Sequence, residues 1–243
     1  MLIDAHCHLA NLAETMSLPG LLEEASNKGI MRFLSSALRR SELGFYQNLN
    51  DPRVKFSAGI HPNFPVCDLA LDDVSALCAS RQIWAIGEIG LDRYNKDLDS
   101  QRRILEDQLH LADKYGLPVV LHIVGHQQLA WEVLRQYPLR YLVHGYAGSV
   151  EGFRLLARLD SWFTISSRIL RADKAALFKA MLEHGRYLFE TDITQYYVYP
   201  GEKNPLLRLL DVFERSVKLS GRDGAELAET QLRSYRELTG ELS

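Results

Sequence analysis

The chain alternates short apolar segments with longer amphipathic segments along its whole length. The amphipathic segments repeat apolar residues every three or four positions, which is typical of helices with one buried face. Two are clearest: Gln101–Tyr115, which Gly116 and Pro118 end, and Pro205–Leu219, for which Gly221 is the expected stop. The apolar segments are too short for helices and are predicted to be strands: Leu2–Ala5, Met31–Ser35, Lys55–Ala58, Ile83–Ile86, Val119–Leu121, Arg140–Val143, Trp162–Ile165 and Tyr187–Phe189.

This alternation of strands and helices predicts an α/β fold, a (β/α)₈ TIM-like barrel that forms a single domain over residues 1–243. Parallel strands need crossover helices, and barrels of this kind typically take about 250 residues. A doubly wound open sheet is the alternative, because the order of strands in a sheet cannot be read from one sequence. The barrel further predicts that functional residues lie at the carboxyl ends of the strands.

Histidines and carboxylates occur where the predicted strands end. Imidazole and carboxylate groups together bind divalent cations such as Zn²⁺ and Mn²⁺. The set is larger than one tetrahedral ion needs, which favours two ions bridged by Glu88, with Asp192 as the general base. The residues are His6 and His8 on the first strand, His61 after the third, Glu88 after the fourth, His122 on the fifth, His144 on the sixth, and Glu190 and Asp192 after the eighth.

Each of these residues also has an explanation that needs no metal. His6 and His8 share one face of a strand, with Cys7 turned away as a packing residue, but alone the pair could be incidental. Glu88, flanked by Gly87 and Gly90, could be a buried carboxylate bonded to loop amides. Asp192 could cap a helix. Their joint occurrence favours the metal site, whereas His110, His126 and His184 fall in or beside helices and are expected to be solvated.

Composition sets few further limits. The formal net charge is −3, so the bulk charge predicts no non-specific nucleic-acid binding, although a local basic groove stays open. Cys7, Cys67 and Cys78 are too few and too irregularly spaced for a disulfide framework and suit reduced thiols. No apolar run approaches the ~18 residues of a membrane span, and no signal peptide is evident. We expect a cytoplasmic, monomeric protein with no membrane segment.

Seven motifs in this order resemble those of the TatD-type metal-dependent hydrolases, a deoxyribonuclease family of the amidohydrolase superfamily. They are IDAHCHL at the start, GIHP at Gly59–Pro62, IGEIGLDRY at Ile86–Tyr94, LPVVLH ending at His122, HGYAGS at His144–Ser149, FETD at Phe189–Asp192 and KNP at Lys203–Pro205.

The resemblance implies a TIM-like barrel with one or two divalent ions (Zn, Mn or Mg) that hydrolyses DNA phosphodiesters. By motif it implies one ion held by His6, His8, Glu88 and Asp192, and a second held by Glu88, His122 and His144. His61 would contact substrate.

The chain also departs from the family pattern. Val124, in HIVGH, lies near the position of a family arginine, and its loss weakens phosphate recognition. ETD is followed by ITQYYVYPG instead of a small residue and proline, the sixth-strand motif reads HGYAG, and the last helix lacks the expected asparagine. The cations that could replace the arginine are Arg93, which we assign to substrate binding, and Lys96, Arg168 and Lys203.

Three tyrosines, Tyr196, Tyr197 and Tyr199, follow the last predicted strand. They could stack on bases of single-stranded DNA, at about 1–3 kcal/mol per base, or pack within their loop. The sequence therefore predicts a metal-dependent phosphodiesterase that acts on DNA through a metal-activated water, with DNA or a small phosphodiester as its partner. The alternatives are hydrolysis of a small phosphate ester, amide or ester in the same centre, or a weakly active, metal-binding accessory protein.

Overall fold

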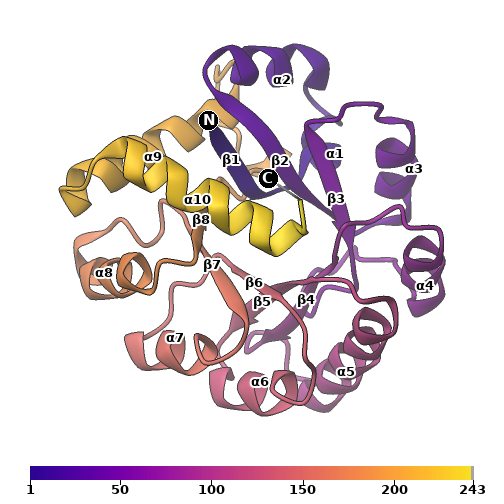
Figure 1. Cartoon of the computed structure of the whole chain (residues 1–243). Helices are drawn as coiled ribbons and strands as arrows, with labels where there is room; N and C mark the ends of the chain where they lie inside the picture. The colour runs from indigo at the N-terminus through magenta and orange to yellow at the C-terminus, as the bar shows by residue number, and fades with distance from the viewer. Residues whose placement is uncertain (242–243) are drawn as a thin grey trace.

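The computed structural model describes residues 1–241 and forms a closed barrel of eight parallel strands surrounded by helices (Figure 1). Each strand pairs with its neighbours in sequence, and β8 returns to β1, where Phe189 lies opposite Asp4. The predicted (β/α)₈ barrel is confirmed, and the open sheet is wrong. The strands are β1 (Leu2–Cys7), β2 (Ile30–Ala37), β3 (Val54–Ala58), β4 (Ile86–Asp92), β5 (Val119–Val124), β6 (Tyr141–His144), β7 (Ser161–Ile165) and β8 (Tyr187–Phe189).

The outer layer consists of the connecting helices, whose apolar faces pack on the barrel. They are α1 (Leu9–Leu12), α2 (Leu18–Asn27), α3 (Arg40–Asn48), α4 (Leu71–Ala79), α5 (Leu98–Tyr115), α6 (Gln127–Leu134), α7 (Val150–Leu156), α8 (Ala175–His184), α9 (Arg208–Ser220) and α10 (Gly224–Thr239), with 3₁₀ turns η1 (Ala172–Lys174), η2 (Gln195–Tyr197) and η3 (Pro205–Leu207). No helix within residues 1–241 is long and apolar enough to cross a membrane.

The fourth strand differs from its prediction. The sequence predicts it at Ile83–Ile86, whereas it spans Ile86–Asp92, so Glu88 lies within the strand rather than after it. Glycines are poor strand formers, and Gly87 and Gly90 hide this strand from a reading of propensity. Here they let β5 approach, because a Cβ atom on Gly90 would overlap the carbonyl oxygen of His122. The fifth strand likewise continues beyond Leu121 to Val124.

The two clearest predicted helices also differ from the structure at their ends. α5 begins at Leu98 rather than Gln101, because the Asp97 side chain accepts a hydrogen bond of 3.0 Å from the backbone N–H of Ser100. The segment predicted as one helix over Pro205–Leu219 is the turn η3 followed by α9. Its expected stop is confirmed: Gly221 follows α9 with φ of 66°.

The amino ends of the strands are covered by α10, which crosses that end of the barrel (Figure 1). Tyr235 and Leu238 of α10 pack against residues inside the barrel such as Ile3. At the same end, Arg140, just before β6, donates a hydrogen bond of 2.9 Å to the carbonyl oxygen of Glu237. Because α10 covers this end, the exposed opening of the barrel lies at the carboxyl ends of the strands.

Candidate metal centre

Glu88 lies at the centre of the histidines that the strand ends bring together. Its Oε2 atom is 3.4 Å from Nε2 of His6 and 3.5 Å from Nε2 of His8. Its Oε1 atom is 2.9 Å from Nδ1 of His122 and 2.7 Å from Nε2 of His144. The two oxygens of one buried carboxylate therefore face two different pairs of imidazoles.

Asp192 joins the pair formed by His6 and His8. Its Oδ1 atom is 3.8 Å from Nε2 of His6 and 3.6 Å from Nε2 of His8. Its backbone N–H donates to the carbonyl oxygen of His6 at 2.9 Å, which places the turn after β8 directly beside β1. Asp192 caps no helix, since the turn that follows is capped by Thr194. Cys7 points away from the site and is buried, as expected, with Sγ 3.7 Å from the carbonyl oxygen of Leu34.

The second ring nitrogens of two histidines determine which nitrogen is free to bind a metal. Nδ1 of His8 is 3.3 Å from the backbone oxygen of Ser36, which can only accept, so Nδ1 carries the proton and Nε2 has a free lone pair. Nε2 of His122 lies 3.0 Å from Oδ2 of Asp92. Burial tends to raise the pKa of Asp92, but its bonds, chiefly to His122, lower it to about 2. The ionised Asp92 accepts from His122, which leaves Nδ1 facing Glu88.

Two further carboxylates, those of Glu190 and Asp4, lie beside the centre. Nδ1 of His144 is 3.7 Å from Oε2 of Glu190, which is fully buried and has no hydrogen-bond partner among residues 1–241. Burial raises the pKa of Asp4 to about 7, and Asp4 accepts hydrogen bonds from the backbone and hydroxyl of Thr191 at 3.0 and 2.6 Å. The sequence reasoning missed Asp4 and Asp92, and it gave Glu190 no role. The available signals were an acidic residue inside the first predicted strand, at Asp4, and a second carboxylate after Glu88 in the same motif, at Asp92.

The electrostatics of the cluster fit a divalent cation. Burial alone would raise the pKa of Glu88, but His144, His61 and His6 hold it well below its usual value. Burial would lower the pKa of His144, yet Glu88 raises it well above its usual value, so a proton balances the carboxylate charge. Nε2 of His6 is buried beside Glu88 and Asp192 without a hydrogen-bond partner among the described residues. A buried imidazole nitrogen without a partner, beside two carboxylates, fits a cation between them.

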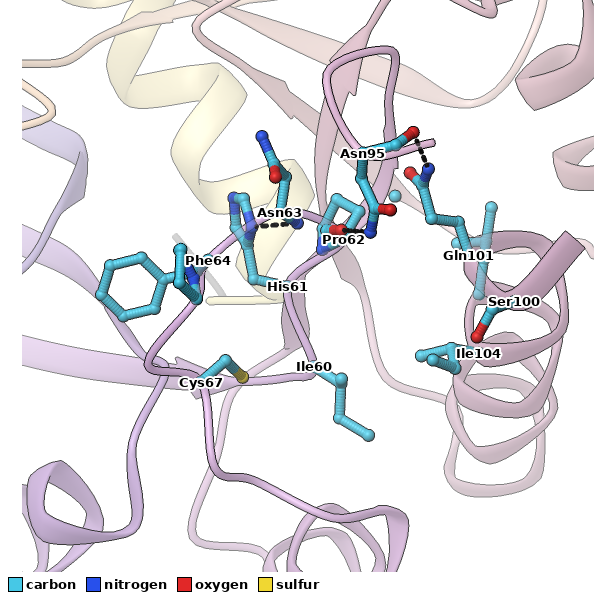
Figure 2. Close-up of a pocket in the computed structure, with 13 residues that line it drawn as sticks. Ile60, His61, Pro62, Asn63, Phe64, Cys67, Asn95, Ser100, Gln101 and Ile104 are labelled. Carbon is cyan, nitrogen blue, oxygen red and sulfur yellow. Dashed lines mark hydrogen bonds between the residues drawn. The ribbon is translucent and has the colours of Figure 1, made fainter. Parts of the chain in front are cut away.

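His61 follows β3 and reaches the same carboxylate. Its Nε2 atom is 3.0 Å from Oε1 of Glu88, and its Nδ1 atom accepts a hydrogen bond of 2.9 Å from the backbone N–H of Asn63 (Figure 2). The neutral ring therefore carries its proton on Nε2. Although His61 lies within metal-binding reach with Glu88 and His122, this tautomer makes it a hydrogen-bond donor rather than a ligand.

The loop that carries His61 is fastened to the start of α5 (Figure 2). Asn95 donates to the carbonyl oxygen of Pro62 at 2.6 Å, and Gln101 of α5 donates to the carbonyl oxygen of Asn95 at 3.0 Å. These bonds fix the loop on a rigid helix. The position of the His61 ring is thereby determined before any substrate enters.

A hollow of about 240 Å³ opens above the cluster. Arg168, one of the four cations considered for phosphate binding, lines this hollow. A nitrogen of its guanidinium group is 2.8 Å from Oδ2 of Asp192. Tyr196 and Tyr197 also line the hollow, and they are 69% and 54% exposed, so packing within their loop does not account for them. Tyr199 is stacked by the guanidinium of Arg208, 3.8 Å from its ring centre.

The remaining predicted residues lie elsewhere. Arg93 lines a neighbouring hollow and rests on the ring of Tyr94, 5.1 Å from its centre. His110 is exposed on α5, as expected. The prediction that His184 is solvated is wrong: its ring is half-buried, because the rings of Phe153 and Phe163 pack against it at 5.7 and 5.9 Å.

Comparisons with known proteins place these features in context. The family model for the TatD related DNase matches residues 3–240. The uncharacterized metal-dependent hydrolase YjjV of Escherichia coli K12 is 27% identical over 95% of this chain and 94% of its own. A crystal structure of YjjV, a TatD homolog, shares the fold, with a TM-score of 0.86 at 24% identity over 98% of this chain and 97% of that one. Human deoxyribonuclease TATDN3 is 25% identical over 79% of this chain and 77% of its own.

Proposed function

The chain belongs to the TatD related DNase family, a family of metal-dependent hydrolases, and we propose that it is a phosphodiesterase that cleaves DNA. The observation that carries the proposal is the position of Glu88, whose two oxygens face two separate pairs of histidines beneath an open hollow. A carboxylate in this position can bridge two divalent ions, one held by each pair of histidines.

The donor set divides naturally between two ions. His6, His8, Glu88 and Asp192 would hold one, and Glu88, His122 and His144 would hold the other. When bound, such ions polarise a phosphoryl oxygen and activate water for in-line attack. The bonds from His8 to Ser36 and from His122 to Asp92 fix the ring tautomers before binding, so that neither ring must reorient.

Asp192 is the general base in this proposal. Its Oδ1 atom faces His6 and His8, whereas Oδ2 lies toward the hollow, where Arg168 contacts it. Burial tends to raise the pKa of Asp192, but His8, His144 and His6 hold it well below its usual range. The carboxylate is therefore ionised, and Oδ2 can accept a proton from the attacking water. The remaining N–H groups of Arg168 bond no residue within 1–241 and can donate to a phosphate oxygen.

His61 and the aromatic rim select and orient the substrate. The Nε2–H group of His61 faces the centre and can donate to a phosphate oxygen in place of Glu88. Phe64, Tyr196 and Tyr197 line the same hollow. Exposed rings beside a phosphate-cleaving centre suit the stacking of unpaired bases, which favours single-stranded DNA over a compact phosphate ester.

The test is hydrolysis by the purified, metal-analysed chain of a single-stranded oligonucleotide, its duplex, bis(p-nitrophenyl) phosphate and p-nitrophenyl acetate, each with Mn²⁺, Mg²⁺ or Zn²⁺. We expect cleavage of the oligonucleotide and of the generic diester, and its loss on chelation. Failure to cleave either with any ion would refute the phosphodiesterase proposal. Cleavage of the acetate ester alone would retain the centre and reject DNA as the substrate.

A further inference from the structure

A second, larger hollow adjoins the metal centre. It has a volume of about 590 Å³ and lies at the carboxyl ends of β4, β5 and β6. Arg168 lines both hollows, so the two share a wall. Arg93 and Lys174 also line the second hollow, together with the polar side chains of Gln127 and Ser149, and none of the aspartates and glutamates in the described part of the chain lines it.

Two of the three cations have no acidic partner within residues 1–241. The guanidinium of Arg93 donates only to the hydroxyl of Tyr94, at 3.0 Å, and Lys174 donates to the carbonyl oxygen of Gly148 at 3.3 Å. The acidic residues nearest to them in sequence are engaged elsewhere. These are Asp173, which pairs with Arg171 at 3.0 Å, and Asp92, which bonds His122.

The backbone fixes where Arg93 lies. Its N–H donates to the carbonyl oxygen of Val124 at 2.9 Å, at the point where β4 and β5 end together. Its side chain then runs along Gly125, where an added Cβ atom would lie only 3.1 Å from Cβ and Cδ of Arg93. The absence of a side chain at Gly125 gives the arginine its path along the wall of the hollow.

We propose that this hollow binds the phosphate that neighbours the scissile phosphate in a DNA strand. The inference rests on the proposed function, because Arg168 joins the hollow to the proposed cleavage centre. The guanidinium of Arg93 and the ammonium group of Lys174 have no carboxylate partner within residues 1–241, and Arg168, which also contacts Asp192, adds a second guanidinium. These groups suit a phosphate dianion or diester. The volume admits the attached sugar. The enzyme would thus require a substrate with a phosphate on one particular side of the cleaved bond.

The test compares three dinucleotides with metal-loaded enzyme: TpT, pTpT and TpTp. We expect kcat/KM for one of the two end-phosphorylated forms to exceed that for TpT by about tenfold or more. In the double variant Arg93→Gln/Lys174→Gln this ratio should fall toward one. The matched control, Lys28→Gln/Lys218→Gln, removes two exposed lysines elsewhere and should keep the wild-type ratio. A wild-type ratio near one for both forms, or an unchanged ratio in the double variant, would overturn the inference.

A binding measurement separates this inference from the proposed function. Calorimetric titration of the Asp192→Asn variant, loaded with metal, with TpT, pTpT and TpTp should give the same preference, and adding Arg93→Gln/Lys174→Gln should remove it. Equal affinities for all three would reject the hollow as a phosphate site even if the enzyme cleaves DNA. A preference in binding, with no cleavage of the oligonucleotide, the generic diester or any dinucleotide by the wild type, would support the hollow and reject the phosphodiesterase.

Discussion

His122 is held between two carboxylates, with Nε2 3.0 Å from Oδ2 of Asp92 and Nδ1 2.9 Å from Oε1 of Glu88. Asp92 thereby fixes the tautomer of a proposed metal ligand without touching the metal. We expect Asp92→Asn to lower metal affinity and kcat/KM by about 10–100-fold, because the amide no longer stabilises the ring in this orientation. Competition with a fluorescent chelator measures the affinity. Asp99→Asn, an exposed acid on α5, is the control. Unchanged affinity in Asp92→Asn would show that the bond is only structural.

Asp192 offers a direct test of the proton-transfer step. Asp192→Asn has the same shape and should keep the fold, but it cannot accept the proton and is a weaker ligand for the first proposed ion. We therefore expect kcat to fall by about 10²–10⁴-fold at metal concentrations that restore the wild-type metal content. Asp211→Asn on α9, which is exposed, should retain activity. Thermal unfolding of both variants checks the fold. Full turnover in Asp192→Asn would eliminate Asp192 as the base.

A Glu88 variant tests how many ions the centre binds. If its two oxygens bridge two ions, Glu88→Ala should bind fewer ions per chain than the wild type, because both pairs of histidines lose their shared ligand. Elemental analysis after dialysis gives the stoichiometry, and near-UV circular dichroism reports on packing. Two ions still bound per chain in this variant would show that Glu88 is no bridge.

The sequence predicted the barrel because each strand–helix unit carries its own local signal. It predicted the cluster because histidines follow apolar strands, as at His122 and His144. It misplaced β4 because Gly87 and Gly90 weaken the local preference for a strand, whereas pairing with β5 decides the outcome. Local preference yields to tertiary contacts at this strand.

The partners of the proposed ligands lie beyond what one sequence reveals. Asp92 reaches His122 from 30 positions away, and Thr191 reaches Asp4 across the closure of the barrel. The sequence assigned Arg93 to substrate binding and left Lys96, Arg168 and Lys203 as further candidates. Only the path of the loop after β7 shows that Arg168 is the one that reaches Asp192. The tautomer of His61 depends on the backbone N–H of Asn63, whose direction no pattern of residue types specifies.

Replacing His61 should lower kcat/KM for the substrate and leave the metal content unchanged. Because its Nε2 carries the proton, His61→Ala removes a donor and no ligand, so metal content should stay at the wild-type level. We expect kcat/KM for the oligonucleotide to fall by about tenfold or more, the effect of one hydrogen bond to a charged group. His61→Gln, which retains an N–H donor, should recover part of the loss, and His110→Ala on the surface of α5 should change nothing. A loss of metal in His61→Ala would instead make it a ligand.

Metal removal should destabilise the fold, because ions that bind only the folded chain shift the unfolding equilibrium. At a free ion concentration 100-fold above Kd the stabilisation is about 2.7 kcal/mol, which for a chain of this size corresponds to a rise in Tm of about 5–11 °C. Calorimetry of loaded, chelated and reloaded protein measures it, and reloading controls for irreversible damage. The rise should be smaller in Glu88→Ala, which loses the shared ligand of both proposed sites. Identical Tm values with and without chelator would contradict binding at the buried cluster, since releasing an ion there leaves Glu88 and Asp192 to be balanced by histidine protons alone.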